Sequence, residues 1–389
     1  QTMTNPEVRP DERVLAPGQP CEGVEVLVPR EVPLGGPRAM TVYRTLPSKR
    51  RSFVGAWCFL DHYGPDDVAS TGGMTVPRHP HTGLATVSWL FTGAVDHLDS
   101  GGNAARVVPG ELNLMIAGSG ITHSEISPPE TTVLHGVQLW TVLPDEHRET
   151  SGRRFDHYVP EPVTFAGGSA LVFMGSLLGS SSPVSTFSPL LGAEVRLDPG
   201  AELTVDVDPT YEHGLLVDAG DLTLEGVGVE PTQLAYTGVG ARTLTVHNAG
   251  ATPGRALLLG GTPFSEEIIM WWNFIGRTHD EIARYRQEWE EHSDRFGRVD
   301  GYIGHDPQGL TRLPAPTLPG TTLRRLPPTD TTKPAFRRQA LAWIWTRFTH
   351  GPMRSSPWPA IPDRDVATFD KRLDPETRLV LHEMGQQLL

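Results

Sequence analysis

The sequence predicts an all-β protein with two β domains in tandem and a few helices near its C-terminus. Gly and Pro, with 41 and 36 copies, make up about a fifth of the 389 residues. Such a density of chain-breaking residues favours short strands and tight turns. Short segments of alternating hydrophobicity recur in two regions, 22–150 and about 170–263, which is typical of β sandwiches and barrels. The length also suits about two domains of ordinary size.

We divide the chain into three parts on this basis. A first β domain covers 22–150, a second β domain with one helix covers 151–300, and an extended strap with a helical tail covers 301–389. The strand segments expected in the first domain are 24–28, 40–46, 86–91 and 137–143. The strand segments expected in the second domain are 193–197, 202–207, 214–217, 221–224 and 242–246. Two β domains in series raise the question of a duplicated barrel.

A helix is predicted over 278–292, because both the residues at its start and the spacing of its apolar residues are typical of a helix. Thr278 can cap its first turn, which also contains two acidic residues. Three apolar residues then fall on one face, Ile282, Tyr285 and Trp289. We expect this helix to pack across the two β domains.

The tail over 335–389 has its own helical pattern. A first helix is expected over 335–349, and a second begins at Asp374, which is followed by Pro at the first helical position. Short helices with an apolar face need a surface to cover it. We therefore expect the tail to dock on the β domains or on a second copy, forming a homo-oligomer. A lid over the mouth of a site is the alternative.

Charge and composition exclude several classes of function. The chain carries 33 basic and 46 acidic residues, a net charge of −13, so direct binding to nucleic acid is disfavoured. No stretch of about 18 apolar residues is present, so no membrane span is expected. The polar start over 1–14 lacks the apolar core of a signal peptide. Cys21 and Cys58 form no disulfide framework, and we expect Cys58 to be a small buried hydrophobic residue. We expect a cytoplasmic protein.

Two pairs of metal-ligating residue types share the same spacing. His79 and His81 are separated by one residue, and so are His123 and Glu125. On a strand this spacing places both side chains on one face, about 7 Å apart. If the two segments are neighbouring strands, all four side chains converge. Three imidazoles and one carboxylate suit one divalent metal per chain, with iron the first choice and zinc, manganese, nickel, copper or cobalt as alternatives. Four ligands leave positions open for catalysis.

A single pair of histidines at this spacing is more often structural than metal-binding. The combination of both pairs, flanked by Gly83, Gly118 and Gly120, is what favours a metal site. The remaining histidines have no partner at ligand spacing and read as turn, surface or core residues. These are His62, His97, His135, His157, His213 and His247.

Several segments resemble the pirin family, and together they cover about 22–320. The segments that carry the resemblance are 46–55, 59–65, 79–83, 109–112, 117–125, 136–140 and 272–279. The resemblance implies a bicupin fold of two small β barrels with one metal, usually iron, in the first. Carried over by position, its ligands are His79, His81, His123 and Glu125. Pirin-like proteins include bacterial quercetin 2,3-dioxygenases and eukaryotic iron-dependent nuclear cofactors.

The chain departs from the pirin pattern after the first motif. Many pirins have an aromatic residue and then Glu where this chain has Leu84 and Ala85. The loss of that acid bears on the substrate more than on the metal, because Glu125 supplies a carboxylate. The second barrel contains His213 without a partner motif, so we expect it to be free of metal.

The leading functional hypothesis is an iron-dependent dioxygenase that uses O2 to open a quercetin-type flavonol or another enolic aromatic. A substrate oxygen at an open metal position would become more acidic. Glu125 would take the hydroxyl proton, acting as both ligand and general base. Gln138 and Trp140 would orient the aromatic substrate, with a core role as the alternative for Trp140. The competing hypotheses are a metal- or redox-sensing regulatory binding protein without turnover and a scaffold with a structural metal.

Overall fold

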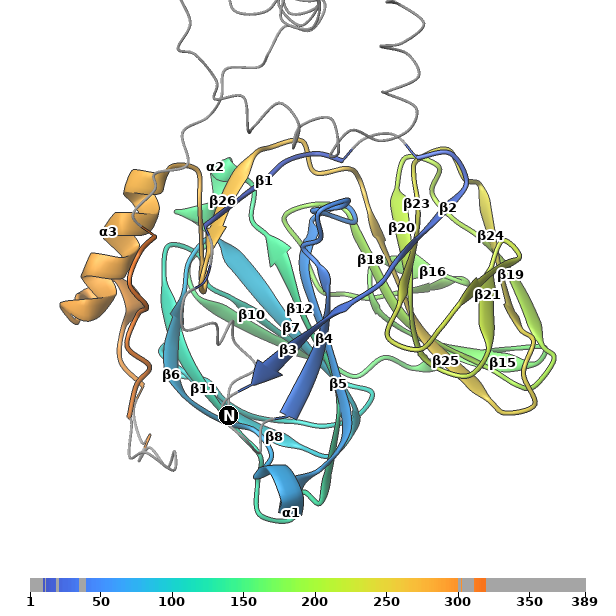
Figure 1. Ribbon diagram of the computed structural model, residues 1–389, viewed down its shortest axis with the longest axis horizontal. Helices are drawn as coiled ribbons and strands as arrows, with labels where there is room; N and C mark the ends of the chain where they lie inside the picture. Colours follow the sequence, from blue (N-terminus) through green and yellow to red (C-terminus); the bar gives the residue numbers. More distant parts are fainter. Residues whose placement is uncertain are drawn as a thin grey trace, which may run out of the picture. The chain divides into compact units, whose positions relative to one another are not determined.

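The computed structural model describes residues 10, 12–18, 21–34, 40–299, 302 and 311–319. Within this part, the prediction of an all-β protein with two tandem β domains is confirmed (Figure 1). The predictions for the tail over 335–389, including its two helices, its docking and its role in a homo-oligomer, lie outside the described residues.

The first domain combines a seven-stranded sheet with a four-stranded sheet. The larger sheet has the order β13-β10-β7-β12-β5-β4-β3. Its strands are β3 (Arg30–Leu34), β4 (Met40–Leu46), β5 (Trp57–Asp67), β7 (Leu84–Thr92), β10 (Leu112–Ile116), β12 (Val133–Val142) and β13 (Arg154–Tyr158). The smaller sheet, in the order β6-β11-β8-β9, comprises β6 (Thr75–His81), β8 (Val95–Asp99), β9 (Ala104–Val107) and β11 (Ile121–Ile126).

The second domain repeats this plan with sheets of seven and four strands. The larger sheet contains β2 (Val24–Leu27), β14 (Pro162–Phe165), β15 (Gly168–Met174), β18 (Leu190–Leu197), β20 (Glu212–Ala219), β23 (Leu234–Thr237) and β25 (Gly254–Gly261). The smaller sheet contains β19 (Glu202–Asp206), β21 (Leu222–Leu224), β22 (Val227–Val229) and β24 (Thr243–Asn248). In both domains the two sheets remain separate hydrogen-bonded ladders, as in double-sheet jelly rolls, instead of one continuous barrel wall.

The remaining elements are short. They are a third sheet of β1 (Arg13–Leu15), β26 (Ile268–Trp271) and β27 (Phe274–Gly276), and a hairpin of β16 (Ser176–Leu177) and β17 (Ser180–Ser181). The helices are α1 (Val68–Thr71), α2 (Asp145–Arg148), α3 (His279–Glu290) and a 3₁₀ turn at Asp294–Phe296. No helix in these described ranges is long and apolar enough to cross a membrane.

Each domain contributes one strand to the sheet of the other. β2 pairs with β23 in the second domain, and β13 pairs with β10 in the first. We still propose a domain boundary near residue 150. Strands β2 and β13 each lie on the other side of this boundary from the strand with which they pair. The exchange ties the domains together through backbone hydrogen bonds.

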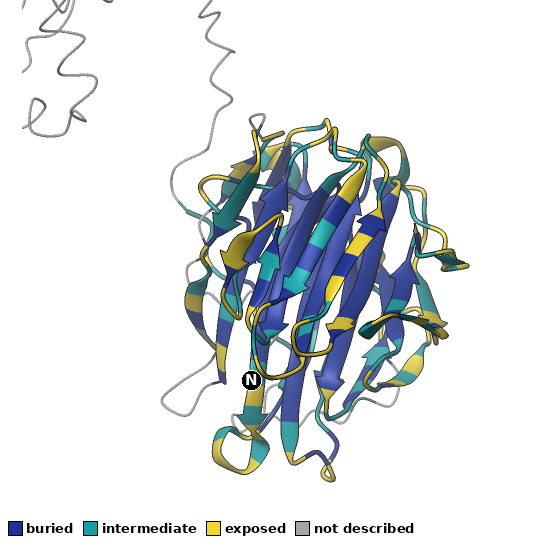
Figure 2. Cartoon of the chain, turned by 90° about the vertical axis from the view of Figure 1, so that its right-hand side faces the viewer, coloured by how far each residue is buried: buried dark blue, intermediate teal, exposed yellow. Residues whose placement is uncertain are grey.

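The interface between the domains is apolar and contains two buried tryptophans. Trp57 donates from Nε1 to the carbonyl oxygens of Leu191 and Gly260, at 3.1 and 3.2 Å. Trp89 donates to Glu194 Oε2 at 2.7 Å and stacks on a phenylalanine of the second domain. Satisfying each indole N–H lets these large rings pack without leaving an unpaired donor. The strands are accordingly buried through the middle of the molecule (Figure 2).

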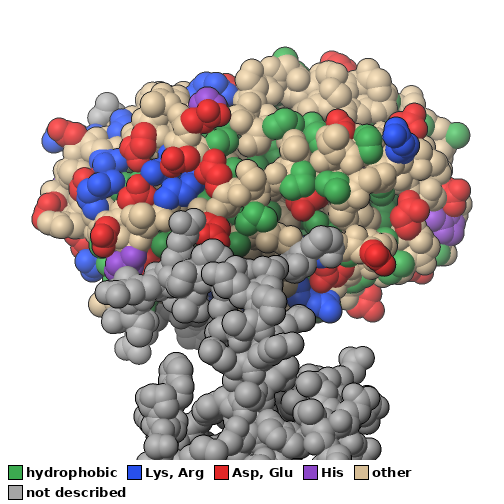
Figure 3. Space-filling model, turned by 90° about the horizontal axis from the view of Figure 1, so that it is seen from above, with side chains coloured by type: hydrophobic (Ala, Val, Ile, Leu, Met, Phe, Trp, Pro, Cys, Tyr) green, Lys and Arg blue, Asp and Glu red, His purple; other side chains and the backbone are tan. Residues whose placement is uncertain are grey.

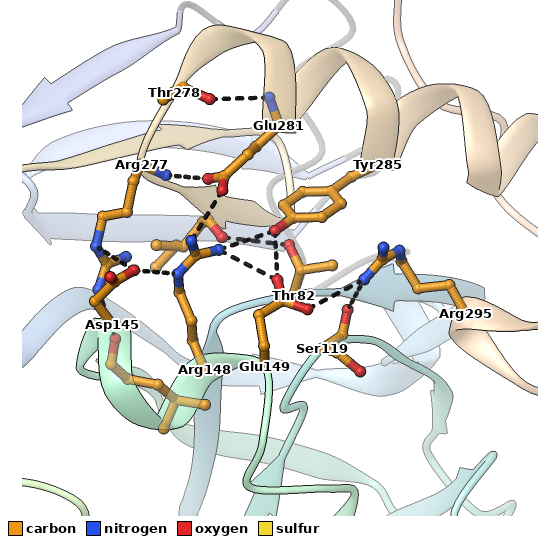
Figure 4. Close-up of polar contacts among 12 residues, drawn as sticks. Thr82, Ser119, Asp145, Arg148, Glu149, Arg277, Thr278, Glu281, Tyr285 and Arg295 are labelled. Carbon is orange, nitrogen blue, oxygen red and sulfur yellow. Dashed lines mark hydrogen bonds and ion pairs between the residues drawn. The ribbon is translucent and has the colours of Figure 1, made fainter.

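Helix α3 begins as the sequence predicts but packs in a different place. Thr278 caps it by accepting from the backbone N–H of Glu281, and its apolar face is buried. It lies against β26, β27 and the first domain, and not across both domains (Figure 1). Its apolar face packs in one buried cluster with Trp271, Phe274 and Phe296. Arg148 of α2 also donates to Glu281 at 2.8 Å and to Tyr285 Oη at 3.1 Å (Figure 4).

The segment around α3 also fixes the end of strand β6. Thr82 Oγ1 donates to the carbonyl oxygen of Ile275 at 3.4 Å, and the N–H of Ile275 donates to the carbonyl oxygen of Thr82 at 3.1 Å (Figure 4). Residues 311–319 run extended along the other side, where the N–H of Leu313 donates to the carbonyl oxygen of Arg78 at 2.8 Å. The strand that carries His79 and His81 is therefore held just after its C-terminal end, at Thr82, and near its middle, at Arg78.

Charged side chains are mixed on the surface seen from above. On that face, basic side chains lie among acidic ones (Figure 3). This arrangement agrees with the net charge of −13 and gives that face no broad positive field for a phosphate backbone.

Candidate metal centre

Strands β6 and β11 lie side by side in antiparallel register. His79 is opposite His123, and His81 is opposite Ile121. The spacing of one intervening residue turns both histidines of β6 to the same face. β6 contains two prolines, which a central strand would not tolerate, but it forms the edge of its sheet. The two motifs are therefore neighbouring strands, as their convergence on one site requires.

The three histidines bring their ring nitrogens together in the interior of the first domain. His81 Nε2 lies 3.1 Å from His123 Nε2. The ring centroids are 4.2 Å apart for His79 and His123, and 5.0 Å for each of the other two pairs. All three residues are 0–1% exposed. They offer ligand atoms within 4.8 Å of one another, the close grouping that a metal requires.

Burial keeps these imidazoles neutral, so each has a lone pair to offer. Desolvation lowers the pKa of His79 to about 3, against a smaller opposing effect of its hydrogen bond to Pro77. Desolvation likewise holds the pKa of His81 and of His123 well below the ordinary value. His79 Nδ1 lies 2.9 Å from the carbonyl oxygen of Pro77, so the proton is on Nδ1. Its Nε2 is buried and has no hydrogen-bond partner among the described residues.

Glu125 lies beside the three histidines but not within the same close group. The β6–β11 register shifts between His123 and Glu125, and such an irregularity re-aims a side chain. Glu125 shares a group of ligand atoms with His123 and His97. Its Oε1 accepts from Ser88 Oγ at 3.3 Å, whereas Oε2 is buried without a partner among the described residues. Burial raises its pKa to about 7.

The two residues expected to orient a substrate are both buried next to this cluster. Gln138 Oε1 accepts from Ser88 Oγ at 2.9 Å, and Ser88 also contacts Glu125. Trp140 stacks on Phe59 with centroids 4.0 Å apart and planes 12° apart. Its ring also lies edge-on to His81, at 5.3 Å. Trp140 is therefore a core residue that also touches a candidate ligand.

One neighbour of the cluster, on strand β8, was not predicted from the sequence. His97 Nδ1 lies 3.3 Å from His123 Nδ1, and His97 Nε2 lies 3.0 Å from Asp99 Oδ2. Burial favours a higher pKa for Asp99, but hydrogen bonds from His97 and Asn103 outweigh it and hold the pKa below its usual value. His97 and Asp99 have the same one-residue spacing as the two metal motifs, and that spacing was the available signal.

A second buried histidine cluster lies between the two domains, and no local sequence pattern indicates it. His62 Nε2 donates to Asp218 Oδ1 at 2.7 Å, and His135 Nε2 lies 2.7 Å from the same oxygen. Arg255 Nε donates to Asp218 Oδ2 at 2.7 Å. Burial alone would raise the pKa of Asp218, but the contacts from His135, His62 and Arg255 hold it well below its usual range. The histidines belong to the first domain and the two charged residues to the second.

A divalent metal fits the residues of the first cluster. Two neutral imidazole nitrogens 3.1 Å apart repel each other through their lone pairs unless a proton or a cation lies between them. His79 Nε2 and Glu125 Oε2 add two buried polar atoms without partners among the described residues. Nitrogen and carboxylate ligands suit first-row divalent metals as a class.

Comparisons with known proteins agree with this fold and this donor set. The family model described as Pirin matches residues 39–141, and the model described as Pirin C-terminal cupin domain matches residues 192–297. A crystal structure of quercetin 2,3-dioxygenase from Acinetobacter baumannii is similar to this chain with a TM-score of 0.71 and 33% identity. The match covers 77% of this chain and 97% of that chain.

Two curated relatives extend the similarity over most of the described residues. A Pseudomonas aeruginosa protein with the provisional name quercetin 2,3-dioxygenase is 42% identical over 292 residues, which is 75% of this chain and 89% of its own length. A pirin-like protein of Caulobacter vibrioides is 33% identical over 260 residues, 64% of this chain and 88% of its own. The expected cupin architecture is thereby confirmed, and the chain belongs to the pirin family.

Proposed function

We propose that this protein is a metal-dependent dioxygenase that opens a quercetin-type flavonol or another enolic aromatic with O2. The observation that carries the proposal is the convergence of three buried, neutral imidazoles beside a carboxylate of raised pKa. The names of the Pseudomonas aeruginosa and Acinetobacter baumannii relatives, both quercetin 2,3-dioxygenase, support the substrate class. Iron is the metal we propose, at one equivalent per chain, with His79, His81, His123 and Glu125 as its ligands.

The metal would supply Lewis acidity toward a substrate hydroxyl and an electron pathway to O2. The role of Glu125 is to accept the hydroxyl proton. Burial raises the pKa of Glu125 to about 7 in the metal-free protein, and a bound divalent cation would favour its ionised form, which can accept a proton. Ser88 contacts Glu125 from one side, and Ser88 in turn contacts Gln138. Trp140 and Phe59 present an aromatic wall beside His81.

The direct test is oxygen consumption with quercetin, comparing iron-loaded and metal-free full-length protein. We expect O2 uptake that depends on both quercetin and iron, and on His79. The His79→Ala variant is the control for adventitious iron in solution. Oxygen uptake that is equal in the metal-free protein would show that this centre does not carry the reaction.

Metal or redox sensing without turnover is a second candidate, and the burial of the centre favours it. The four proposed ligands are between 0% and 2% exposed, so a flavonol can reach them only if neighbouring residues move. Under this alternative, metal binding changes the surface or stability of the protein but quercetin does not consume O2. Hydrogen exchange of the metal-free and loaded forms, measured beside the oxygen assay, separates the two functions.

A further inference from the structure

We propose that Asp99 and His97 act as a positioning relay that fixes the proton of His123 on Nδ1 and so presents His123 Nε2 to the metal. The inference rests on the proposed metal site and goes beyond it, since neither residue is among the proposed ligands. It follows from a chain of contacts that crosses the β8–β11 strand pair. In that pair, His123 is opposite Asp99 and Glu125 is opposite His97.

The relay begins at a carboxylate that is held firmly in one position. Asp99 Oδ1 accepts from the backbone N–H of Gly101 at 2.7 Å and from the backbone N–H of Asn103 at 3.2 Å. The side-chain amide of Asn103 donates to both carboxylate oxygens, at 2.9 and 3.0 Å. These contacts orient Oδ2 toward His97. An ionised carboxylate only accepts hydrogen bonds, so His97 must place its proton on Nε2, which lies 3.0 Å away.

The proton on His97 Nε2 determines which ring nitrogen of His123 carries a proton. A neutral imidazole with its proton on Nε2 has a lone pair on Nδ1. His97 Nδ1 lies 3.3 Å from His123 Nδ1, so a hydrogen bond between them requires the proton on His123 Nδ1. The Nε2 of His123 is then left with a lone pair, and it is this atom that faces His81 Nε2 at 3.1 Å.

Packing holds the intermediate ring in place. His97 is 4% exposed, and its ring lies against Phe155 of β13 with centroids 4.7 Å apart. Metal-ligating histidines commonly donate their second N–H to a carboxylate or a carbonyl, and loss of that partner costs about 10–100-fold in metal affinity. Here a histidine stands between the ligand and the carboxylate. In His79 no residue intervenes, because its Nδ1 donates directly to the carbonyl oxygen of Pro77.

The test uses Co²⁺ titrated into metal-free, full-length protein and followed by its visible absorption. In His97→Phe the ring is kept but the acceptor is lost, and we expect about 10–100-fold weaker Co²⁺ binding. In His97→Asn the side-chain oxygen stands near the former Nδ1 and still accepts from His123. We expect its affinity within about threefold of wild type, with an unchanged absorption spectrum.

A double-variant comparison separates the relay from a purely structural role. Asp99→Asn should weaken Co²⁺ binding about tenfold in the wild-type background but not in the His97→Asn background, where the relay is already bypassed. Asp96→Asn is the matched control on the same strand, because Asp96 pairs with Arg106 at the surface, and it should change nothing. If Asp99 only stabilised its turn, its substitution would cost the same in both backgrounds.

Four results would overturn the relay. Equal losses from Asp99→Asn in both backgrounds would assign Asp99 a structural role. A spectrum changed in His97→Asn as strongly as in His79→Asn would make His97 itself a ligand. Co²⁺ binding that is lost in His79→Ala but unaffected in all His97 and Asp99 variants would reject the relay while leaving the proposed function intact. A wild-type protein that binds no Co²⁺ would reject both.

Discussion

The molecule contains two buried histidine clusters that differ in what their nitrogens face. In the first domain, His81 Nε2 and His123 Nε2 face each other at 3.1 Å. Between the domains, the Nε2 atoms of His62 and His135 both face one oxygen of Asp218 at 2.7 Å. Histidine nitrogens that converge on one another favour a cation, whereas the nitrogens of His62 and His135 already face an anionic carboxylate.

Electrostatics strengthen the contrast. The Asp218 carboxylate already has a cationic partner, since Arg255 donates to its second oxygen at 2.7 Å. A metal added there would bring two further positive charges into a buried site that has no second carboxylate in this cluster. We therefore interpret this cluster as a link between domains.

The first prediction, with the largest effect, removes the histidines of one cluster at a time and compares the metal content of the two variants. The double variant His79→Ala with His123→Ala should reduce the metal content from near one equivalent per chain to near zero, because it removes two of three converging nitrogens. His62→Ala with His135→Ala should retain the metal. Elemental analysis of protein purified without chelator measures both. Two equivalents in the wild type, or metal kept in the first variant, would contradict the assignment.

The second prediction concerns the carboxylate of the metal centre. Glu125→Gln keeps an oxygen for the metal but removes the base, so flavonol turnover should fall by about 10²-fold or more while the metal is largely retained. Glu194→Gln is a matched control, since Glu194 is equally buried but accepts from Trp89 at the domain interface. Unchanged turnover of metal-loaded Glu125→Gln would exclude this residue as the base.

The third prediction tests the interdomain cluster as a structural link. Asp218→Asn leaves Arg255 without its anionic partner in a partly buried position. We expect a loss of about 2–4 kcal/mol in the free energy of unfolding, measured by urea denaturation, and no change in metal content. Arg196→Gln is a control, because that arginine pairs with Glu194 but is 55% exposed. Loss of the metal in Asp218→Asn would show that the two clusters are coupled.

The smallest expected effect concerns His213, a buried histidine of the second domain whose two ring nitrogens have no partner among the described residues. Burial lowers its pKa to about 4 from an ordinary value of 6.5. The unfolded chain therefore takes up a proton between pH 6.5 and 4 that the folded chain refuses, and stability falls as the pH is lowered through this window. Asp218, with its lowered pKa, loses its contribution only at lower pH.

Replacement of His213 tests this assignment through the pH dependence of unfolding. His213→Leu should flatten the decline in stability between pH 6.5 and 4, by at most about 1.4 kcal/mol per pH unit for one group, as measured by urea denaturation. His247→Gln, a half-buried histidine on the smaller sheet of the same domain, should leave the slope as it is. An unchanged slope in His213→Leu would place the acid sensitivity elsewhere.

Local sequence patterns are sufficient to predict the fold class and most of the candidate site. Short apolar segments bounded by turn residues identify β4, β7 and β12, of which β7 and β12 are buried on both faces. The cap at Thr278 locates the start of α3 for an equally local reason. The one-residue spacing of His79 and His81 selects a shared face wherever the strand lies. Each of these signals depends on residues within a few positions of one another.

Which of these segments meet, and where their protons lie, depends on the three-dimensional fold. His62 and Asp218 are 156 positions apart, and the exchanged strands β2 and β13 lie in sheets that local periodicity cannot assign. The irregularity that turns Glu125 toward His97 depends on pairing with both β6 and β8. The tautomer of His123 depends on a carboxylate two hydrogen bonds away. Such features arise from contacts between segments that are distant in the sequence, so a local sequence pattern cannot predict them.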